Sequence, residues 1–195
     1  MDQETLQASF KAYFSGLMPG IDWQRLTLPY SVHHITKGDH LFKQGEPAQR
    51  LYFLHSGLVR YVNLSEDGKE FTQSFVPAPR MIGSTRAMVT GAAAQFSIQA
   101  LEDSVVMSYP WAEFFKLYES DVGFLKGYVH FLEQIFIREQ DLKKRLERDS
   151  AEKRYLDFCA EHADIIDKIP LQQVASYIGI TPVALSRIRG KLRGR

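Results

Sequence analysis

The segment that most constrains the fold is LQQVASYIGITPVALSRIRG, residues 171–190. Gly179 lies at its centre, where a sharp turn between two helices needs a left-handed backbone angle. Thr181 can then cap the second helix, and Pro182 can fill its first turn, where a missing N–H does no harm. Ala175 is small where the second helix must approach the first. The apolar side chains that the crossed helices would bury are Val174, Ile178, Ile180, Leu185 and Ile188. This pattern predicts a helix-turn-helix.

The charge at this end of the chain favours a polyanionic partner. From Ile169 onward there is no acidic residue, and the basic ones are Arg187, Arg189, Lys191, Arg193 and Arg195. Because the whole chain carries +1, residues 1–168 carry −4. A cationic tail that only aids solubility would fit the charge equally well. The predicted helix-turn-helix favours DNA as the partner over a tail that only aids solubility, because this fold places its second helix in the major groove.

The candidate DNA contacts follow from that placement. Base edges are expected to meet the first turn and outward side of the second helix, which hold Pro182, Val183, Ser186 and Arg187. Arg187 is the candidate for a bidentate contact to guanine. Phosphates are expected to meet Arg189, Lys191, Arg193, Arg195, Thr181 with the amides at the helix start, and Gln172 and Gln173 at the start of the first helix.

The preceding residues have the pattern of an α+β protein. Residues 5–18 carry apolar side chains at helical spacing, which predicts an amphipathic helix. Residues 21–110 break into short runs rich in Val, Ile, Phe and Tyr, separated by KGD, QGEP, HSG, EDGK, PAP and VTG. Such runs predict a small antiparallel sandwich or barrel. The clearest hairpin is NLSEDGKEFTQSFV, where Asp67 and Gly68 supply the positive φ angles of a tight turn.

Residues 120–149 contain no proline and predict one long helix, capped by Ser120 or Asp121 and about 40 Å long. Steps of three and four residues connect a nearly apolar series, which is typical of a coiled-coil seam: Leu125, Tyr128, Leu132, Ile135, Glu139, Leu142 and Leu146. These residues could pack either against a second copy of the helix in a dimer or against their own domain. We favour a symmetric dimer, because one small barrel can hardly cover so long a seam. Residues 150–195 then read as three further helices.

Several classes of protein are not expected. Cys159 is the single cysteine, which excludes an internal disulfide and a cysteine-only metal or iron–sulfur site and fits a reducing cytoplasm. The N-terminal residues do not have the pattern of a signal peptide, and no apolar stretch is long enough for a bilayer, so we expect a cytoplasmic protein without a membrane partner. An enzyme is not expected, since no nucleophile–base–orienter set, phosphate-cradling glycine loop or pair of carboxylates stands out.

With these parts in this order, the chain resembles the Crp/Fnr family of bacterial transcription regulators. The motifs are KGDHLFKQGEPAQRLYFLHSGLVRYV, with glycines at its turns, and ALEDSVVMSYP. The resemblance implies an antiparallel β-roll effector domain like that of cyclic-nucleotide-binding proteins at 1–119, a dimerisation helix at 120–149 and a helix-turn-helix domain at 150–195. That last domain would be of the winged-helix type without the final wing. The implied partners are an inverted-repeat duplex, a second copy of the chain and RNA polymerase.

The chain departs from the family at the ligand motif. Where nucleotide-binding members carry Gly-Glu and, about ten residues on, Arg-Ser, this chain has Gly83-Ser84 and Ala94-Gln95. An anion in a closed pocket needs a cation and donors, so a response to cyclic AMP is not expected. The candidate pocket for another effector, if there is one, consists of Gly83, Ser84, Thr85, Arg86 and Gln95. No metal or cofactor is predicted, because His33, His34, His40 and His55 lie at turns or strand ends without a third ligand.

The recognition helix departs from the family too. Members that bind guanine-rich half-sites commonly begin this helix with Arg and Glu, where this chain has Pro182 and Val183, while the later arginine is kept as Arg187. The half-site sequence therefore cannot be carried over. The alternative function is a small-molecule-binding module whose C-terminal helices dock onto a protein. The absence of acidic residues after Asp167 argues against it, because a protein-docking hairpin has no reason to avoid them.

Overall fold

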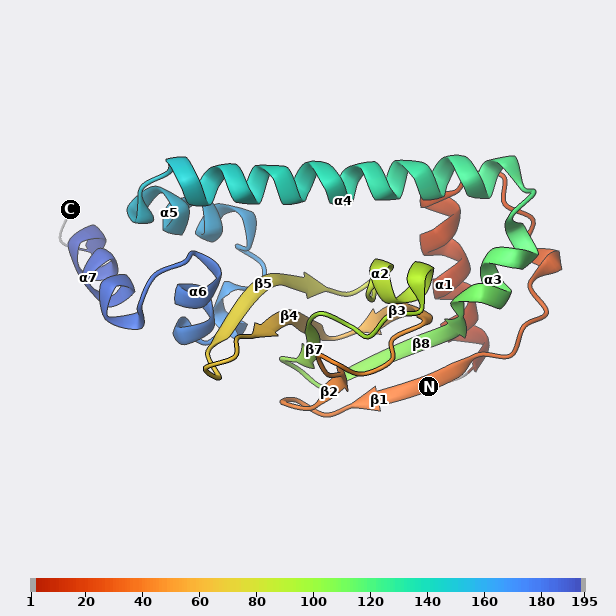
Figure 1. The fold of residues 1–195 in the computed structure, drawn as a ribbon, viewed down its shortest axis with the longest axis horizontal. Coiled ribbons are helices and arrows are strands. Elements are labelled where there is room, and N and C mark those ends of the chain that lie inside the picture. The colour runs from red at the N-terminus through yellow and green to blue at the C-terminus, as the bar shows by residue number, and fades with distance from the viewer. Residues whose placement is uncertain (1–2, 194–195) are drawn as a thin grey trace.

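The computed structural model describes residues 3–193 as an α+β fold in which one long helix runs beside a β-roll (Figure 1). In chain order, the elements are α1 (Gln3–Leu17), η1 (Trp23–Arg25), β1 (Ser31–Ile35), β2 (His40–Phe42), β3 (Arg50–Ser56), β4 (Leu58–Leu64), β5 (Glu70–Pro77), β6 (Arg80–Ile82), α2 (Thr85–Thr90), β7 (Ser97–Ala100), β8 (Ser104–Pro110), α3 (Trp111–Tyr118), α4 (Val122–Arg148), α5 (Ala151–Glu161), η2 (Ile166–Lys168), α6 (Leu171–Tyr177) and α7 (Pro182–Arg193). Arg195, one of the predicted phosphate contacts, lies outside the described residues. None of the helices within 3–193 has the length and hydropathy that crossing a bilayer requires.

The β region forms two four-stranded antiparallel sheets, in the orders β1-β8-β3-β6 and β2-β7-β4-β5. Their facing sides bury a core with Phe42, Leu54 and Ile98 at its centre. The predicted hairpin is β4–β5, paired from Leu58↔Pro77 to Leu64↔Glu70. Gly68 has φ +80° in its turn. The predictions of an antiparallel sandwich and of this hairpin are confirmed, but the positive φ predicted for Asp67 is wrong, because within residues 3–193 only glycines have positive φ angles.

Helices α1 and α3 and the start of α4 cover the outer side of the first sheet. Aromatic side chains dominate that core: the ring of Phe10 lies 5.7 Å from Phe53 and 5.2 Å from Tyr109, centroid to centroid. The predicted N-terminal helix therefore exists as α1, and its apolar stripe holds it on the sheet. This aromatic core also holds Phe124 of α4, which is fully buried.

The long helix α4 begins where the sequence predicts. The carboxylate of Asp121 accepts a hydrogen bond from the Phe124 amide at 2.8 Å, which satisfies one of the free N–H groups of the first turn. Its first turns lie against the end of α1. A Cβ at Gly127 would stand 2.5 Å from the Leu17 carbonyl oxygen and 2.9 Å from the Met18 Cα atom, so only glycine allows this approach.

We expect Gly127→Ala to destabilise the protein by about 1–3 kcal/mol, because the added methyl group overlaps backbone atoms of α1 that cannot rotate away. Urea denaturation followed by circular dichroism measures the change. Gly16→Ala is the matched control, since a Cβ there meets nothing within 4 Å. That change is expected to stabilise α1 by about 0.5–1 kcal/mol. Equal stabilities of the two variants would contradict the close approach of α4 to α1.

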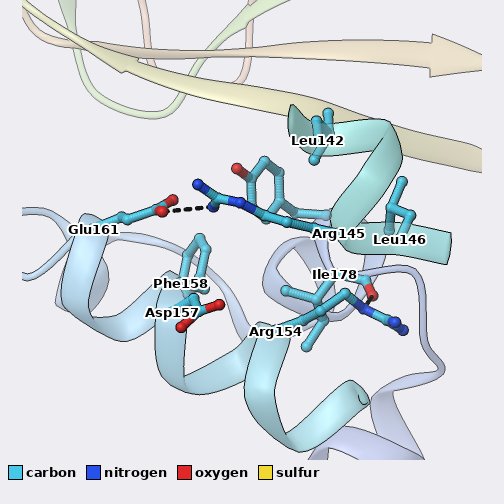
Figure 2. A pocket seen from close by; sticks show the side chains of 9 residues that line it. Leu142, Arg145, Leu146, Arg154, Asp157, Phe158, Glu161 and Ile178 are labelled. Carbon is cyan, nitrogen blue, oxygen red and sulfur yellow. Dashed lines mark hydrogen bonds and ion pairs between the residues drawn. The ribbon is translucent and has the colours of Figure 1, made fainter. Parts of the chain in front are cut away.

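The predicted seam of α4 is divided between two faces of the helix. Tyr128 packs on its own domain, with its ring 5.3 Å from Trp111 and 5.9 Å from Phe124. Leu142 and Leu146 also face the same chain, where they line a small cavity with side chains of α5 and α6 (Figure 2). For Tyr128 and Leu142 the alternative, packing against the chain itself, describes this structure, whereas Leu146 contributes to the cavity wall but is 44% exposed.

A second apolar stripe of α4 points to solvent. Val122, Val129 and Phe136 lie seven residues apart and are 63%, 54% and 64% exposed. Leu125 and Leu132 lie between them on the same stripe and are half-buried. These positions follow the a and d pattern of a heptad repeat. This stripe shares Leu125 and Leu132 with the predicted series, and two other residues of that series, Ile135 and Leu146, are also exposed, by 36% and 44%.

The C-terminal helices gather at the end of the roll opposite to α1 and α3 (Figure 1). Helices α5, α6 and α7 bury a third core that includes Phe158 and Leu185, and this core continues into the roll through Leu58, Phe75 and Leu101. An ion pair of 2.9 Å between Lys168 and Glu102 also joins the two parts. The prediction of three helices after residue 150 is confirmed.

Candidate nucleic-acid interface

Helices α6 and α7 are joined by the predicted tight turn. Gly179 has φ +71°, and the Ile180 amide donates to the Ala175 carbonyl oxygen at 3.0 Å. The Thr181 hydroxyl accepts from the Ala184 amide at 3.2 Å and so caps α7. A residue with a Cβ would be strained at the left-handed position. The local chemistry of the helix-turn-helix is therefore the chemistry that the sequence predicts.

A small apolar core fixes how the two helices cross. Val174, Ala175, Ile178 and Leu185 are all at most 2% exposed. Ile180 and Ile188, which the sequence also predicts to be buried, are only half-buried. Ala175 has no exposed surface, as expected where α7 crosses closest to α6. Because the side of α7 that carries Leu185 is buried in this core, the opposite side of the helix faces solvent.

The outward side of α7 is a continuous exposed stripe, which we call the outer face: Val183, Ser186, Arg187 and Gly190. These residues follow the i, i+3, i+4, i+7 spacing of one helix side. Pro182 and Arg193 are exposed beside them. A Cβ at Gly190 would meet nothing within 4 Å, so the surface is open there. Sequence reasoning missed Gly190, although its spacing from Val183 and Arg187 places it on the same side.

The basic side chains of α7 differ in what they contact. Within residues 3–193, no ion pair or hydrogen bond engages Arg187. The Lys191 ammonium lies 2.8 Å from the Glu152 carboxylate of α5. Arg189 lies beside Tyr155. Burial raises the pKa of the Tyr155 hydroxyl above its ordinary value, and the positive charge of Arg189 offsets part of that rise. Within residues 3–193, Arg187 and Arg193 are thus free to bind a new partner, whereas Lys191 would have to share Glu152.

The two glutamines that open α6 have different environments. Gln172 is exposed, as a phosphate contact requires. Gln173 is half-buried, and its Oε1 atom is buried without a hydrogen-bond partner in the described residues. The structure therefore places Gln172 at the surface at the start of α6 and turns part of Gln173 inward.

Helix α6 is fastened to the edge of the roll by one side chain that sequence reasoning missed. The Ser176 hydroxyl donates to the Glu70 carbonyl oxygen at 3.1 Å and accepts from the Thr72 amide at 2.9 Å. β5 is an edge strand, so Ser176 satisfies backbone groups that have no neighbouring strand. Behind it, the buried guanidinium of Arg60 pairs with the Glu70 carboxylate at 2.6 Å. No motif identifies such a contact, because it joins residues that are 104 and 106 positions apart.

Ser176→Ala is expected to destabilise the protein by about 1–3 kcal/mol, because the Thr72 amide and the Glu70 carbonyl oxygen both lose a partner. Faster hydrogen exchange at the Thr72 amide would accompany the loss. The control is Ser186→Ala, an exposed serine of the outer face, which should change stability by less than about 0.5 kcal/mol. Unaltered exchange at Thr72 in Ser176→Ala would show that the roll does not need this contact.

A second set of contacts fixes the helix-turn-helix to the end of α4. Figure 2 shows Arg154 of α5 donating to the Ile178 carbonyl oxygen at the end of α6, at 2.8 Å. The same guanidinium donates to the Asp149 carbonyl oxygen at the end of α4, at 2.6 Å. Nearby, Arg145 of α4 pairs with Glu161 of α5 at 2.5 Å. The position of α7 is therefore coupled to the position of α4.

The predicted effector residues do not converge on an open anion site. The Gly83 amide donates to the Tyr61 hydroxyl at 3.0 Å, and Ser84 caps α2 by accepting from the Ala87 amide at 3.3 Å. Thr85 follows within α2, half-buried, and the side chains of Arg86 and Gln95 are exposed.

Aromatic side chains fill the interior beside this segment. The ring of Tyr61 lies 5.0 Å from Phe96, which lies 6.1 Å from Phe42. Burial raises the pKa of Tyr61 to about 12, so its hydroxyl stays neutral. Ala94, at the position where the family has arginine, is 3% exposed and packs in the same core. Among the described residues, none of those that form this core is a cation, and the buried position next to Gln95 is Ala94.

The sequence is similar to a known domain family and to known regulatory proteins. Residues 32–121 match the family model of the cyclic nucleotide-binding domain. The electron transport regulator A of Shewanella oneidensis is 23% identical over 170 residues, which cover 82% of this chain and 67% of that protein. The fumarate nitrate reduction regulatory protein of Klebsiella oxytoca is 26% identical over the same shares of the two chains.

Solved structures share the whole architecture. A protein described as a transcriptional regulator of the Crp/Fnr family from Eubacterium rectale superposes with a TM-score of 0.74 at 17% identity, over 91% of this chain and 88% of that one. The c-di-GMP responsive global regulator of Xanthomonas campestris gives a TM-score of 0.71 at 13% identity, over 85% and 87%. The fold therefore extends from the roll through the long helix to the C-terminal helices.

Proposed function

Since the chain belongs to the Crp/Fnr family of transcription regulators, we propose that it acts as a homodimer that binds inverted-repeat DNA through α7. Residues 1–119 serve in this proposal as the effector domain, 120–149 as the dimerisation helix and 150–195 as the DNA-binding domain. No catalytic role is proposed.

The observation that carries the proposal is the outer face of α7. It is exposed along the whole helix, it holds the unpaired Arg187, and it follows a capped N-terminus whose amides suit a phosphate. Pro182, Val183, Ser186 and Arg187 are the proposed base contacts. Thr181, Gln172, Gln173, Arg189, Lys191 and Arg193 are the proposed phosphate contacts.

Dimerisation is supported by the exposed stripe of α4. A helix that leaves Val122, Val129 and Phe136 more than half exposed at heptad spacing gains by burying them against a copy of itself. A twofold axis beside this stripe would present two copies of α7. Their centres would then meet successive major-groove segments about 34 Å apart.

The proposal also covers the response to cyclic AMP, the protein partner and the cellular location. The aromatic filling of the roll and the bond from the Gly83 amide to Tyr61 support a regulator that does not respond to cyclic AMP. A regulator of this class works with RNA polymerase, which is the proposed protein partner. Its place of action is the cytoplasm, where the chromosome lies.

Selection from random duplexes by the full-length protein tests the function. We expect enriched inverted repeats, and we expect the logarithm of the affinity to fall linearly with the logarithm of salt concentration. Three cationic phosphate contacts per subunit, six per dimer, would give a slope of about −5.4. Failure to enrich any sequence, together with binding that salt does not change, would favour the alternative that the C-terminal helices dock onto a protein.

A further inference from the structure

We propose that Val183 is a specificity-determining residue that selects a thymine in each half-site by packing on the C5-methyl group of that base. This inference rests on the proposed function, because it names what the outer face of α7 recognises. It assigns to one apolar side chain a role that charge alone could not fill.

The position of Val183 is the first observation. It is the second residue of α7, in the turn that enters the major groove first. Its side chain is 62% exposed, and it shares the outer face with Ser186, Arg187 and Gly190. It is the single apolar side chain of that face, and no described element covers it. A single exposed valine is ordinary on a protein surface, and it is the location of Val183 in the first turn of α7 that indicates a role in recognition.

The chemistry of the groove is the second step. An isopropyl group neither donates nor accepts a hydrogen bond. Against N7 or O6 of guanine, or the amino groups of adenine and cytosine, it would displace water without replacing the lost hydrogen bond. The thymine methyl is the apolar group that the major groove offers. Valine also has one strongly preferred χ1 rotamer in a helix, so its methyl groups present a fixed surface.

The spacing between Val183 and Arg187 limits where the thymine lies. Residues four apart on one helix side are about 6 Å apart, and successive base pairs rise by about 3.4 Å. If Arg187 contacts a guanine, the thymine is then one or two base pairs away in the same half-site. The two residues would act as a pair, with the arginine supplying hydrogen bonds and the valine supplying apolar contact.

Deoxyuridine provides the test, because it lacks only the methyl group of thymine. The selected duplex is prepared with deoxyuridine in place of each candidate thymine, and binding of the full-length protein is measured by fluorescence anisotropy. We expect the affinity to fall about fourfold for each half-site at the thymine that Val183 contacts, the factor that follows from one buried methyl-sized group. Val183→Ala keeps one methyl group in place of the isopropyl group, so its preference between the two duplexes should be smaller than that of the unaltered protein.

The controls separate this inference from the function on which it rests. Val89→Ala shortens a valine of α2 that is equally exposed, at 61%, and lies outside α7, so it should keep the preference for thymine over deoxyuridine. Tight binding to the selected duplex with no preference between the two bases would overturn the role of Val183 and leave DNA binding standing. A protein that selects no duplex would overturn both. Since Val183 is exposed, Val183→Ala is expected to fold, which its thermal melting curve verifies.

Discussion

A variant with lysine at both Val129 and Phe136 is expected to be monomeric and to bind a duplex with two half-sites about 10²- to 10⁴-fold more weakly. The two side chains are 54% and 64% exposed in the single chain, so the substitutions do not disturb its own core. In a dimer across this stripe, each lysine would bury its charge beside the same residue of the partner helix. Burial of unpaired like charges is strongly unfavourable.

Analytical ultracentrifugation measures the change of mass, and anisotropy titrations measure binding to one-site and two-site duplexes. Affinity for the single half-site should not change, because α7 is untouched. Ile137→Lys is the matched control: it is an exposed apolar residue of α4, 49% accessible, at the position after Phe136 and outside the stripe. A double-lysine variant that stays dimeric would move the interface away from this face of α4.

The sequence predicted the helix-turn-helix in detail because its signals are local. The left-handed Gly179, the cap at Thr181 and the buried Leu185 each follow from the geometry of a few neighbouring residues. The same holds for the hairpin at Asp67-Gly68 and for the cap at Asp121. Local chemistry of this kind is independent of what the rest of the chain does.

The face of α4 was not predictable in the same way. The helix carries two apolar stripes, one around Phe124 and Tyr128 and one through Val129 and Phe136, and spacing alone does not say which stripe the chain covers. The choice is made by the aromatic core of α1 and α3, which receives Tyr128. The contact with this core therefore determines which stripe of α4 is buried, because the helical spacing of apolar residues allows either one.

Long-range polar contacts were invisible for a related reason. Ser176 bonds to the backbone of β5, and Lys191 pairs with Glu152 of α5. Serine and lysine are common on surfaces, so neither identity nor spacing marks these pairs. Their consequence for function is concrete: the basic end that looked uniform in sequence contains the unpaired Arg187 and the paired Lys191.

Arg187→Ala is expected to remove the strongest base contact of each subunit. A bidentate arginine–guanine pair contributes about 1–3 kcal/mol of discrimination, so two half-sites together should lose about 30-fold to 10⁴-fold in affinity. The preference for guanine at that position should disappear as well. Because Arg187 is exposed and unpaired in the described chain, its removal should leave the melting temperature unchanged.

Two matched variants distinguish base recognition from charge. Arg187→Lys keeps the charge but lacks the planar fork, so it should recover little of the guanine preference. Arg193→Ala removes an equally exposed cation of the same helix. It should weaken binding to all sequences alike and make the salt slope shallower by about two for a dimer. If Arg187→Ala behaved like Arg193→Ala, with uniform weakening and an unaltered base preference, Arg187 would be a phosphate contact, and another residue of the outer face would have to select the guanine.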